Sequence, residues 1–332
     1  IEMRGFMNLF IFWMACGFLL TLAGMLLVMP PLIERLHDLK FGQTEREEGL
    51  ASHKKKQGTP TMGGLAFIAV PFVVYCFLCL TGTCTFSMNA AIVWTAFMGY
   101  GLIGFLDDYI IAVKKDNTGL KPWIKFGMQS VLAAAVFGMY MAGGNPMTIH
   151  IPGTEISLNL SYLYIIMIFF MFTGCSNAVN LADGVDGLCA GLSAIALVPF
   201  LVLGLLQDFD IAAIALLVIA ALLGYLVFNL HPAKVFMGDT GSLALGGLLA
   251  AVSMVLKAEL LLIVIGGVFI AETLSVIIQV AYFKRTKKRI FLMAPLHHHY
   301  EKKGWDENKV VRIFWCWGIL FAVLGLVIGV MI

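Results

Sequence analysis

Long apolar runs separated by short polar breaks form the main pattern along the chain. Each run is about 20 residues long, which is the length that an α-helix needs to cross the hydrocarbon core of a membrane. The pattern predicts an all-α, polytopic integral membrane protein with ten transmembrane helices. The predicted spans are 6–29, 62–81, 90–110, 123–142, 161–179, 188–206, 211–229, 242–257, 259–283 and 309–332.

The count of ten depends on two very short polar breaks, at 207–210 and 257–259. Each must act as a tight hairpin, and without either one a terminus would move to the other side of the membrane. Composition supports the membrane assignment, because 60% of the residues are hydrophobic and only 13% are charged, against about 25% charged in soluble domains. The spans leave no room for a separate soluble domain, so residues 1–332 are predicted to form a single transmembrane catalytic domain.

Basic residues predict the orientation, because Lys and Arg are retained in cytoplasmic loops. Loops after odd-numbered spans hold seventeen Lys and Arg, whereas loops after even-numbered spans hold one, Lys257. We therefore expect the odd-numbered loops to be cytoplasmic and both termini to be extracytoplasmic. The formal net charge of +2 is too small to indicate nucleic-acid binding.

One outside loop is long enough to carry structure of its own. Its residues alternate between polar and apolar on either side of Pro152 and Gly153. This alternation predicts a small β-hairpin near 147–158.

Carboxylates are scarce in this chain, so their positions are informative. Asp107 and Asp108 close the third span in the segment GFLDDY. Adjacent carboxylates suit Mg²⁺, which prefers oxygen ligands and keeps waters that a substrate phosphate can displace. Capping or solvation at the membrane interface is the competing interpretation of this pair.

The end of the fifth span carries polar residues at regular spacing, in NAVNLADGVDGL. Asn177, Asn180, Asp183 and Asp186 follow one another at intervals of three residues. On a helix or a tight turn this spacing places amides and carboxylates on one face. Glycines within the segment would let the backbone approach a ligand closely, so a functional role is favoured over capping.

A third acidic position precedes the eighth span, in NLHPAKVFMGDTGS. Asp239 comes immediately before Thr240 and Ser242, which are predicted to open a helix. A helix N-terminus attracts phosphate oxygens, and a neighbouring carboxylate can hold a bridging metal. A simple N-cap is the alternative. Lys56 and Lys125, in other cytoplasmic segments, would supply positive charge for phosphate groups.

Three consecutive histidines lie in the last cytoplasmic loop, in APLHHHYEKKGW. In an extended backbone His297 and His299 would face one way and His298 the other. Such a cluster suits contacts with phosphate and sugar better than one zinc ion, and a solvated loop is the alternative. The acidic, amide, histidine and lysine groups are all predicted on one side of the membrane, and together they indicate a metal-and-phosphate site.

These segments occur together and in order with GTPTMGG, and the sequence closely resembles the phospho-N-acetylmuramoyl-pentapeptide transferase (MraY) family from about residue 30 onward. The Asp-Asp and NxxNxxDGxxDG patterns are similar to those of the wider superfamily of polyprenyl-phosphate sugar-1-phosphate transferases. The resemblance implies Mg²⁺-dependent transfer from UDP-N-acetylmuramoyl-pentapeptide to undecaprenyl phosphate, giving lipid I and UMP. It also implies a homodimer in the bacterial plasma membrane, with a site that faces the cytoplasm, and nucleoside antibiotics as candidate inhibitors.

The resemblance also assigns roles to individual residues, with Asp239 as the Mg²⁺ ligand and Asp107 and Asp108 beside the reacting phosphates. The residues expected in catalysis are Asp107, Asp108, Lys125, Asp239 and His297. The residues expected to bind substrate are Lys56, Asn177, Asn180, Asp183, Asp186, Phe236, His298 and His299.

Two other classes of protein would fit parts of the pattern. A secondary transporter could use the intramembrane residues Glu272 and Gln279, but transport sites lie near the membrane midplane, whereas the acidic residues here gather at one face. A metal-dependent lipid phosphatase would also use such a face. With no Ser-His or Cys-His pair evident, we expect direct transfer without a phosphorylated aspartate.

Overall fold

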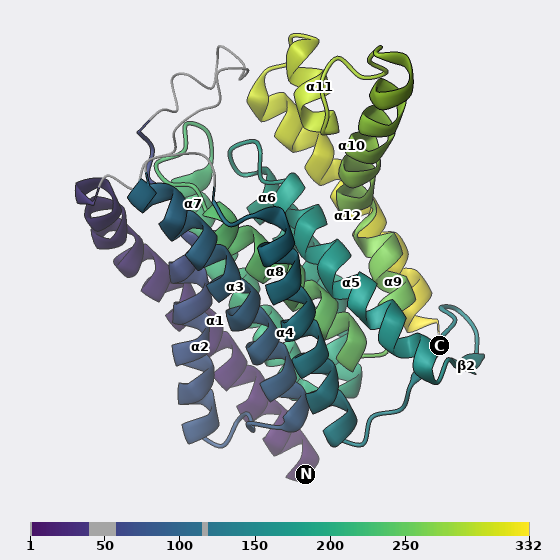
Figure 1. Ribbon diagram of the computed structural model, residues 1–332. Coiled ribbons are helices and arrows are strands. Elements are labelled where there is room, and N and C mark those ends of the chain that lie inside the picture. The colour runs from purple at the N-terminus through teal and green to yellow at the C-terminus, as the bar shows by residue number, and fades with distance from the viewer. Residues whose placement is uncertain (1, 40–57, 115–118, 332) are drawn as a thin grey trace.

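The structure is a computed structural model that describes residues 2–39, 58–114 and 119–331, which form a helical bundle with one small hairpin (Figure 1). The helices are α1 (Glu2–Asp38), α2 (Gly64–Leu80), α3 (Met88–Lys114), α4 (Pro122–Ala142), α5 (Tyr162–Leu181), α6 (Leu188–Gln207), α7 (Phe209–Asn229), α8 (Gly238–Val255), α9 (Glu259–Ile265), α10 (Gly267–Thr286), α11 (Leu296–Lys302) and α12 (Glu307–Val330). The strands are β1 (Thr148–His150) and β2 (Ser157–Asn159).

The predicted polytopic helical architecture is confirmed. Among the described residues, nine helices are long and apolar enough to cross a membrane, and α2 is a shorter apolar helix of 17 residues. Both short breaks on which the count depended are present, since α6 ends at Gln207 and α8 ends at Val255. Asp208 caps α7, because its side chain accepts the backbone N–H groups of Asp210 and Ile211.

The ninth predicted span, 259–283, is wrong as one continuous helix. It is divided into α9 and α10 at Gly266, whose N–H closes α9 on the carbonyl of Leu262 at 2.8 Å. Every residue near the break is apolar, so hydropathy could not reveal it. At the other end of the chain, α1 continues past its apolar run to Asp38, nine residues beyond the predicted end.

The predicted hairpin is confirmed. Strands β1 and β2 pair antiparallel, with Ile149 opposite Leu158. Gly153 has a φ of +76° in the turn between them, a conformation that glycine adopts without strain.

Helix α8 lies at the centre of the bundle. Of its most apolar stretch, 89% of the residues are buried inside the protein, compared with 22% for α1, α4, α10 and α12. The outer helices therefore present their apolar side chains outward, as lipid-facing helices do. In Figure 1 both chain ends and the hairpin lie at one end of the bundle, whereas α11 lies at the opposite end.

Candidate functional site

The first turn of α8 is held by a carboxylate from α3. Asp108 Oδ1 accepts the N–H of Asp239 at 3.1 Å, and Oδ2 accepts the N–H and the hydroxyl of Thr240 at 2.9 and 2.6 Å. The first N–H groups of a helix have no partner within the helix. Asp108 thus caps α8 across the bundle, and the capping interpretation of the sequence holds for this residue.

Two glycines allow α3 and α8 to meet so closely. A Cβ at Gly104 would lie 2.0 Å from the carbonyl oxygen of Asp239. Gly238 has a φ of +69°, and a Cβ there would lie 2.3 Å from Asp108 Oδ2. Any other residue at these positions would push the helices apart.

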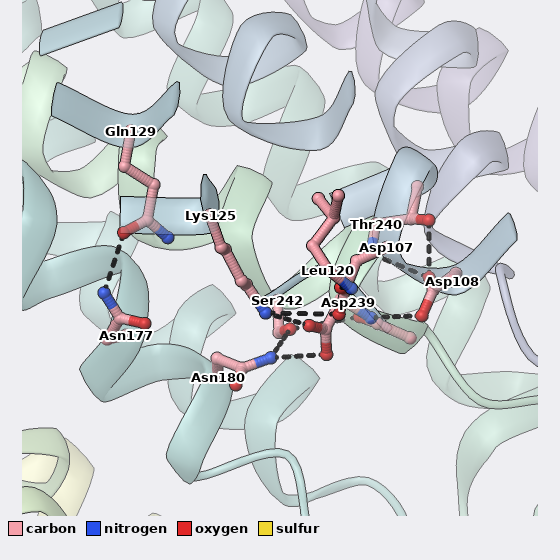
Figure 2. A network of polar contacts seen from close by, with 11 residues as sticks. Asp107, Asp108, Leu120, Lys125, Gln129, Asn177, Asn180, Asp239, Thr240 and Ser242 are labelled. Carbon is pink, nitrogen blue, oxygen red and sulfur yellow. Dashed lines mark hydrogen bonds and ion pairs between the residues drawn. The ribbon is translucent and has the colours of Figure 1, made fainter. Parts of the chain in front are cut away.

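Two carboxylates from different helices converge on one lysine ammonium (Figure 2). Lys125 of α4 contacts Asp239 Oδ2, and its Nζ also lies 3.4 Å from Asp107 Oδ2. The other oxygen of Asp107 accepts the N–H of Leu120 at 2.5 Å. The side chains of Lys125 and Asp239 keep 17% and 25% of their surface exposed, so the meeting point is open to ligands.

One of the two predicted amides reaches this cluster. Asn180 Nδ2 donates to Asp239 Oδ1 at 2.7 Å and to Ser242 Oγ at 2.9 Å. Asn177 instead donates to Gln129 Oε1 at 3.0 Å and to the carbonyl of Thr173. Figure 2 shows the Asn177–Gln129 pair apart from the group around Asp239.

Phe236 links the start of α2 to the start of α8. Its N–H donates to the carbonyl of Pro60 at 2.8 Å, and its carbonyl accepts the N–H of Gly63 at 2.9 Å. The GTPTMGG segment therefore runs alongside the loop that leads into Asp239. Lys56 lies outside the described residues.

The predicted shared face of the four NxxNxxDGxxDG residues is wrong for Asp186. Helix α5 ends at Leu181, and the chain then turns before α6. Asp183 lies half-buried in this turn. Asp186 Oδ2 accepts the N–H of Ala233 at 3.1 Å and lies 3.0 Å from His231 Nδ1.

Glu307, in the first turn of α12, completes this second polar group. Its Oε2 lies 3.2 Å from His231 Nδ1, and its Oε1 accepts the N–H of Asp186 at 2.9 Å. The ligand-type atoms of Asp186, His231 and Glu307 lie within 4.8 Å of one another. This group joins three segments far apart in the sequence, and sequence reasoning missed both His231 and Glu307.

The extended backbone predicted for the three histidines is wrong, because they lie in the short helix α11. The ring of His297 is completely buried. His298 Nδ1 lies 2.7 Å from Glu301 Oε2, and His299 Nδ1 accepts the N–H of Leu292 at 3.0 Å. Burial and the nearby Lys303 lower the pKa of His299, which agrees with an unprotonated acceptor nitrogen.

Carboxyl groups outnumber basic groups around Asp239. Asp107 and Asp239 contact the ammonium of Lys125, and Asp108 lies beside them against the first turn of α8, so three carboxyl groups share a single lysine. Carboxylate oxygens from separate helices are the donors that Mg²⁺ prefers. The residues therefore fit this ion, whereas the imidazole beside Asp186 suits transition metals better.

Comparisons with known proteins agree with the geometry. Residues 90–257 match the model of glycosyl transferase family 4. This range includes the Asp-Asp pair, Lys125 and Asp239. Residues 56–68 match phospho-N-acetylmuramoyl-pentapeptide-transferase signature 1. The chain is 50% identical over 320 residues to the phospho-N-acetylmuramoyl-pentapeptide-transferase of Geobacillus sp. (strain WCH70), covering 96% of this chain and 98% of the relative. It is 49% identical over 321 residues to that of Bacillus subtilis (strain 168), with the same coverage.

Proposed function

Because the chain belongs to the phospho-N-acetylmuramoyl-pentapeptide-transferase family, we propose that it transfers phospho-N-acetylmuramoyl-pentapeptide from its UDP carrier to undecaprenyl phosphate. The products are lipid I and UMP. The observation that carries the proposal is the convergence of Asp107 and Asp239 on Lys125 beside the first turn of α8. Such a group can hold both a cation and the phosphates of two substrates.

We propose Mg²⁺ as the cofactor, held by Asp239 with Asp107. When bound, the ion would offset the charge of the donor diphosphate and of the acceptor phosphate. Asn180 fixes the position of the Asp239 carboxylate, because it donates to Oδ1. The ammonium of Lys125 bridges these two carboxylates in the structure. With the ion bound, it would contact phosphate oxygens.

The proposed reaction is a direct displacement. An oxygen of undecaprenyl phosphate attacks the sugar-bound phosphorus of the donor, and UMP leaves with the electrons of the broken phosphoanhydride bond. A phosphate monoester has a second pKa of about 6, so the acceptor is largely a dianion at neutral pH and hardly needs a general base. The protein has to hold two anions together, and this is electrostatic positioning.

The hydrogen bonds of the Asp-Asp pair argue against a covalent intermediate. Both oxygens of Asp108 accept hydrogen bonds from α8, and Asp107 accepts from Leu120. Carboxylates engaged in this way are weak nucleophiles. Labelled UMP should therefore not exchange into the donor in the absence of undecaprenyl phosphate, and exchange at a rate comparable to turnover would establish a two-step mechanism.

The product released separates this proposal from its rivals. We expect purified protein in detergent to release UMP only when donor and undecaprenyl phosphate are both present. Release of inorganic phosphate would indicate a lipid phosphatase. Uptake of solute into vesicles with no UMP would indicate a transporter.

The finer topology is also proposed. We infer ten spans, formed by the nine long apolar helices and α2, with both termini and the hairpin extracytoplasmic and the Asp239 group facing the cytoplasm of a bacterial cell. The seventeen-to-one distribution of basic residues supports this orientation, as does the position of both chain ends beside the hairpin. A homodimer and inhibition by nucleoside antibiotics remain expectations drawn from the family.

A further inference from the structure

Helix α10 and helix α11 share a buried pair of titratable groups that the proposed mechanism does not use. Neither Glu272 nor His297 has any exposed side-chain surface. His297 Nδ1 lies 3.2 Å from Glu272 Oε1, and the backbone N–H of His297 donates to the same oxygen at 3.3 Å. The carboxylate therefore contacts both the ring and the backbone of the first histidine of α11.

The opposite edge of the His297 ring, at Nε2, packs closely against the turn between α5 and α6. A Cβ built at Gly184 would lie 2.3 Å from His297 Nε2, so only glycine permits this contact. Gly184 directly follows Asp183, a residue expected to bind the donor. The imidazole thus separates Glu272 on one side from the Asp183–Gly184 backbone on the other.

Among the described residues, Glu272 Oε2 and His297 Nε2 have no hydrogen-bond partner, and His297 Nδ1 has only its 3.2 Å approach to Glu272 Oε1, which does not meet hydrogen-bond geometry. A buried polar atom without a partner destabilises the folded state, because it gives up its hydrogen bonds to water and gains none. A hydrophobic pair of the same size would avoid this cost. The chain therefore keeps polar groups at a place where packing alone would favour apolar ones.

We propose that Glu272 is a positioning residue, which acts through His297 on the Asp183–Gly184 turn and so shapes the binding site of the nucleotide donor. This inference rests on the proposed transferase function. The Glu272 carboxylate lies against the His297 ring and its backbone N–H and so orients the ring, and the ring holds the turn in place. Glu272 itself is completely buried and touches no substrate.

The test compares two buried glutamates in detergent-purified protein. Glu272→Gln keeps the size and one acceptor oxygen but removes the charge. Glu259→Gln is the matched control, because Glu259 of α9 is also buried and also has one oxygen without a partner, yet it contacts Tyr164 and Lys257 at the other end of the bundle. Both variants are assayed for the KM of donor and of acceptor, for UMP binding by calorimetry and for melting temperature.

We expect Glu272→Gln to raise the donor KM about tenfold and to weaken UMP binding similarly, with the acceptor KM within about twofold. Glu259→Gln should lower the melting temperature while leaving the donor KM unchanged. If Glu272→Gln changes only the melting temperature, or raises both KM values equally, the positioning role is overturned.

A second variant tests the same contact by changing Gly184 in the turn. Gly184→Ala should raise the donor KM at least as much as Glu272→Gln, because its Cβ would displace the ring or the turn. A normal donor KM in Gly184→Ala would overturn the inference even if Glu272→Gln failed to fold. Failure of the proposed function would look different, since the unmodified protein would then release no UMP at all.

Discussion

Each end of α8 lies beside a half-buried lysine that is paired with carboxylate, and the two pairs differ in how far their carboxylates are exposed. The ends are about 27 Å apart, since α8 has 18 residues and a helix rises about 1.5 Å per residue. At the first turn, Lys125 meets Asp107 and Asp239. Beyond the last turn, Lys257 meets Glu259 at 3.4 Å.

The surroundings of Lys257 satisfy its charge fully. Its Nζ lies 2.6 Å from the hydroxyl of Tyr140 and 3.0 Å from that of Tyr164, over whose rings it also lies. Tyr164 in turn donates to Glu259 at 2.5 Å. One lysine is matched here by one glutamate, and aromatic rings flank the lysine. The two lysines are equally exposed, at 17%, but the Asp239 side chain keeps 25% of its surface exposed and that of Glu259 only 2%. Only the first turn of α8 therefore offers an accessible carboxylate, which a cation requires.

The largest expected effect is at Asp239. Asp239→Asn should reduce turnover by at least about 1,000-fold, because a neutral amide cannot replace a carboxylate ligand of a phosphate-bridging metal. The fold should persist, because the cap from Asp108 uses the backbone N–H of residue 239. Turnover and melting temperature are measured on the same sample, and a folded variant with near-normal rate would remove Asp239 from the site.

A smaller effect is expected when the cap of α8 is removed. Asp108→Ala should reduce turnover about 100-fold, because a displacement of roughly 1 Å at reacting groups costs about that much. Asp208→Ala is the matched control, since it removes the cap of α7 at the other end of the bundle. The control should lose about 1 kcal/mol of stability with unchanged turnover. Equal rates in the two variants would show that the Asp108 cap does not position Asp239.

A change in the Lys257–Glu259 pair beyond the end of α8 should alter the stability of the protein rather than its turnover. Lys257→Met leaves Glu259 buried without a compensating charge, and we expect about 3 kcal/mol of destabilisation. Turnover per folded molecule should stay normal. A thermal melt and an active-site-normalised rate check this, and a selective loss of rate would mean that the two ends of α8 are functionally coupled.

The smallest effect is expected at His299. The pKa of this histidine is lowered in the folded protein, so its neutral form is the stable one, and the Leu292 N–H needs the unprotonated Nδ1. This contribution to stability is present above the ordinary histidine pKa of about 6.5 and is lost as the pH falls through the lowered pKa of the folded protein. The protection factor of the Leu292 amide, which is corrected for the intrinsic pH dependence of hydrogen exchange, should therefore fall on acidification, and this fall should be absent in His299→Gln.

The sequence predicted most helices to within a few residues, because each crosses the membrane as one apolar run. Helix α4 was expected at 123–142 and is Pro122–Ala142. Helix α11 was missed, since seven residues with three histidines have no apolar periodicity. The break at Gly266 was missed because the residues on both sides are apolar.

For the site, the sequence predicted several of the residues that come together but not the contacts that they make with other segments. Asp239, Asp107 and Lys125 were all expected, and the structure brings them together. The cap that Asp108 provides to α8 and the approach of Glu307 to Asp186 join segments more than 100 residues apart. Such contacts depend on how the helices pack, and local spacing carries no signal for them.

Binding of a divalent ion tests the central claim most directly, because it does not depend on turnover. Mn²⁺ can serve as a paramagnetic probe that Mg²⁺ displaces. We expect one displaceable Mn²⁺ per chain in the unmodified protein and in Glu259→Gln, and none in Asp239→Asn at the same concentration. Retention of the ion in Asp239→Asn, or its loss in Glu259→Gln alone, would contradict the assignment of the metal to the first turn of α8.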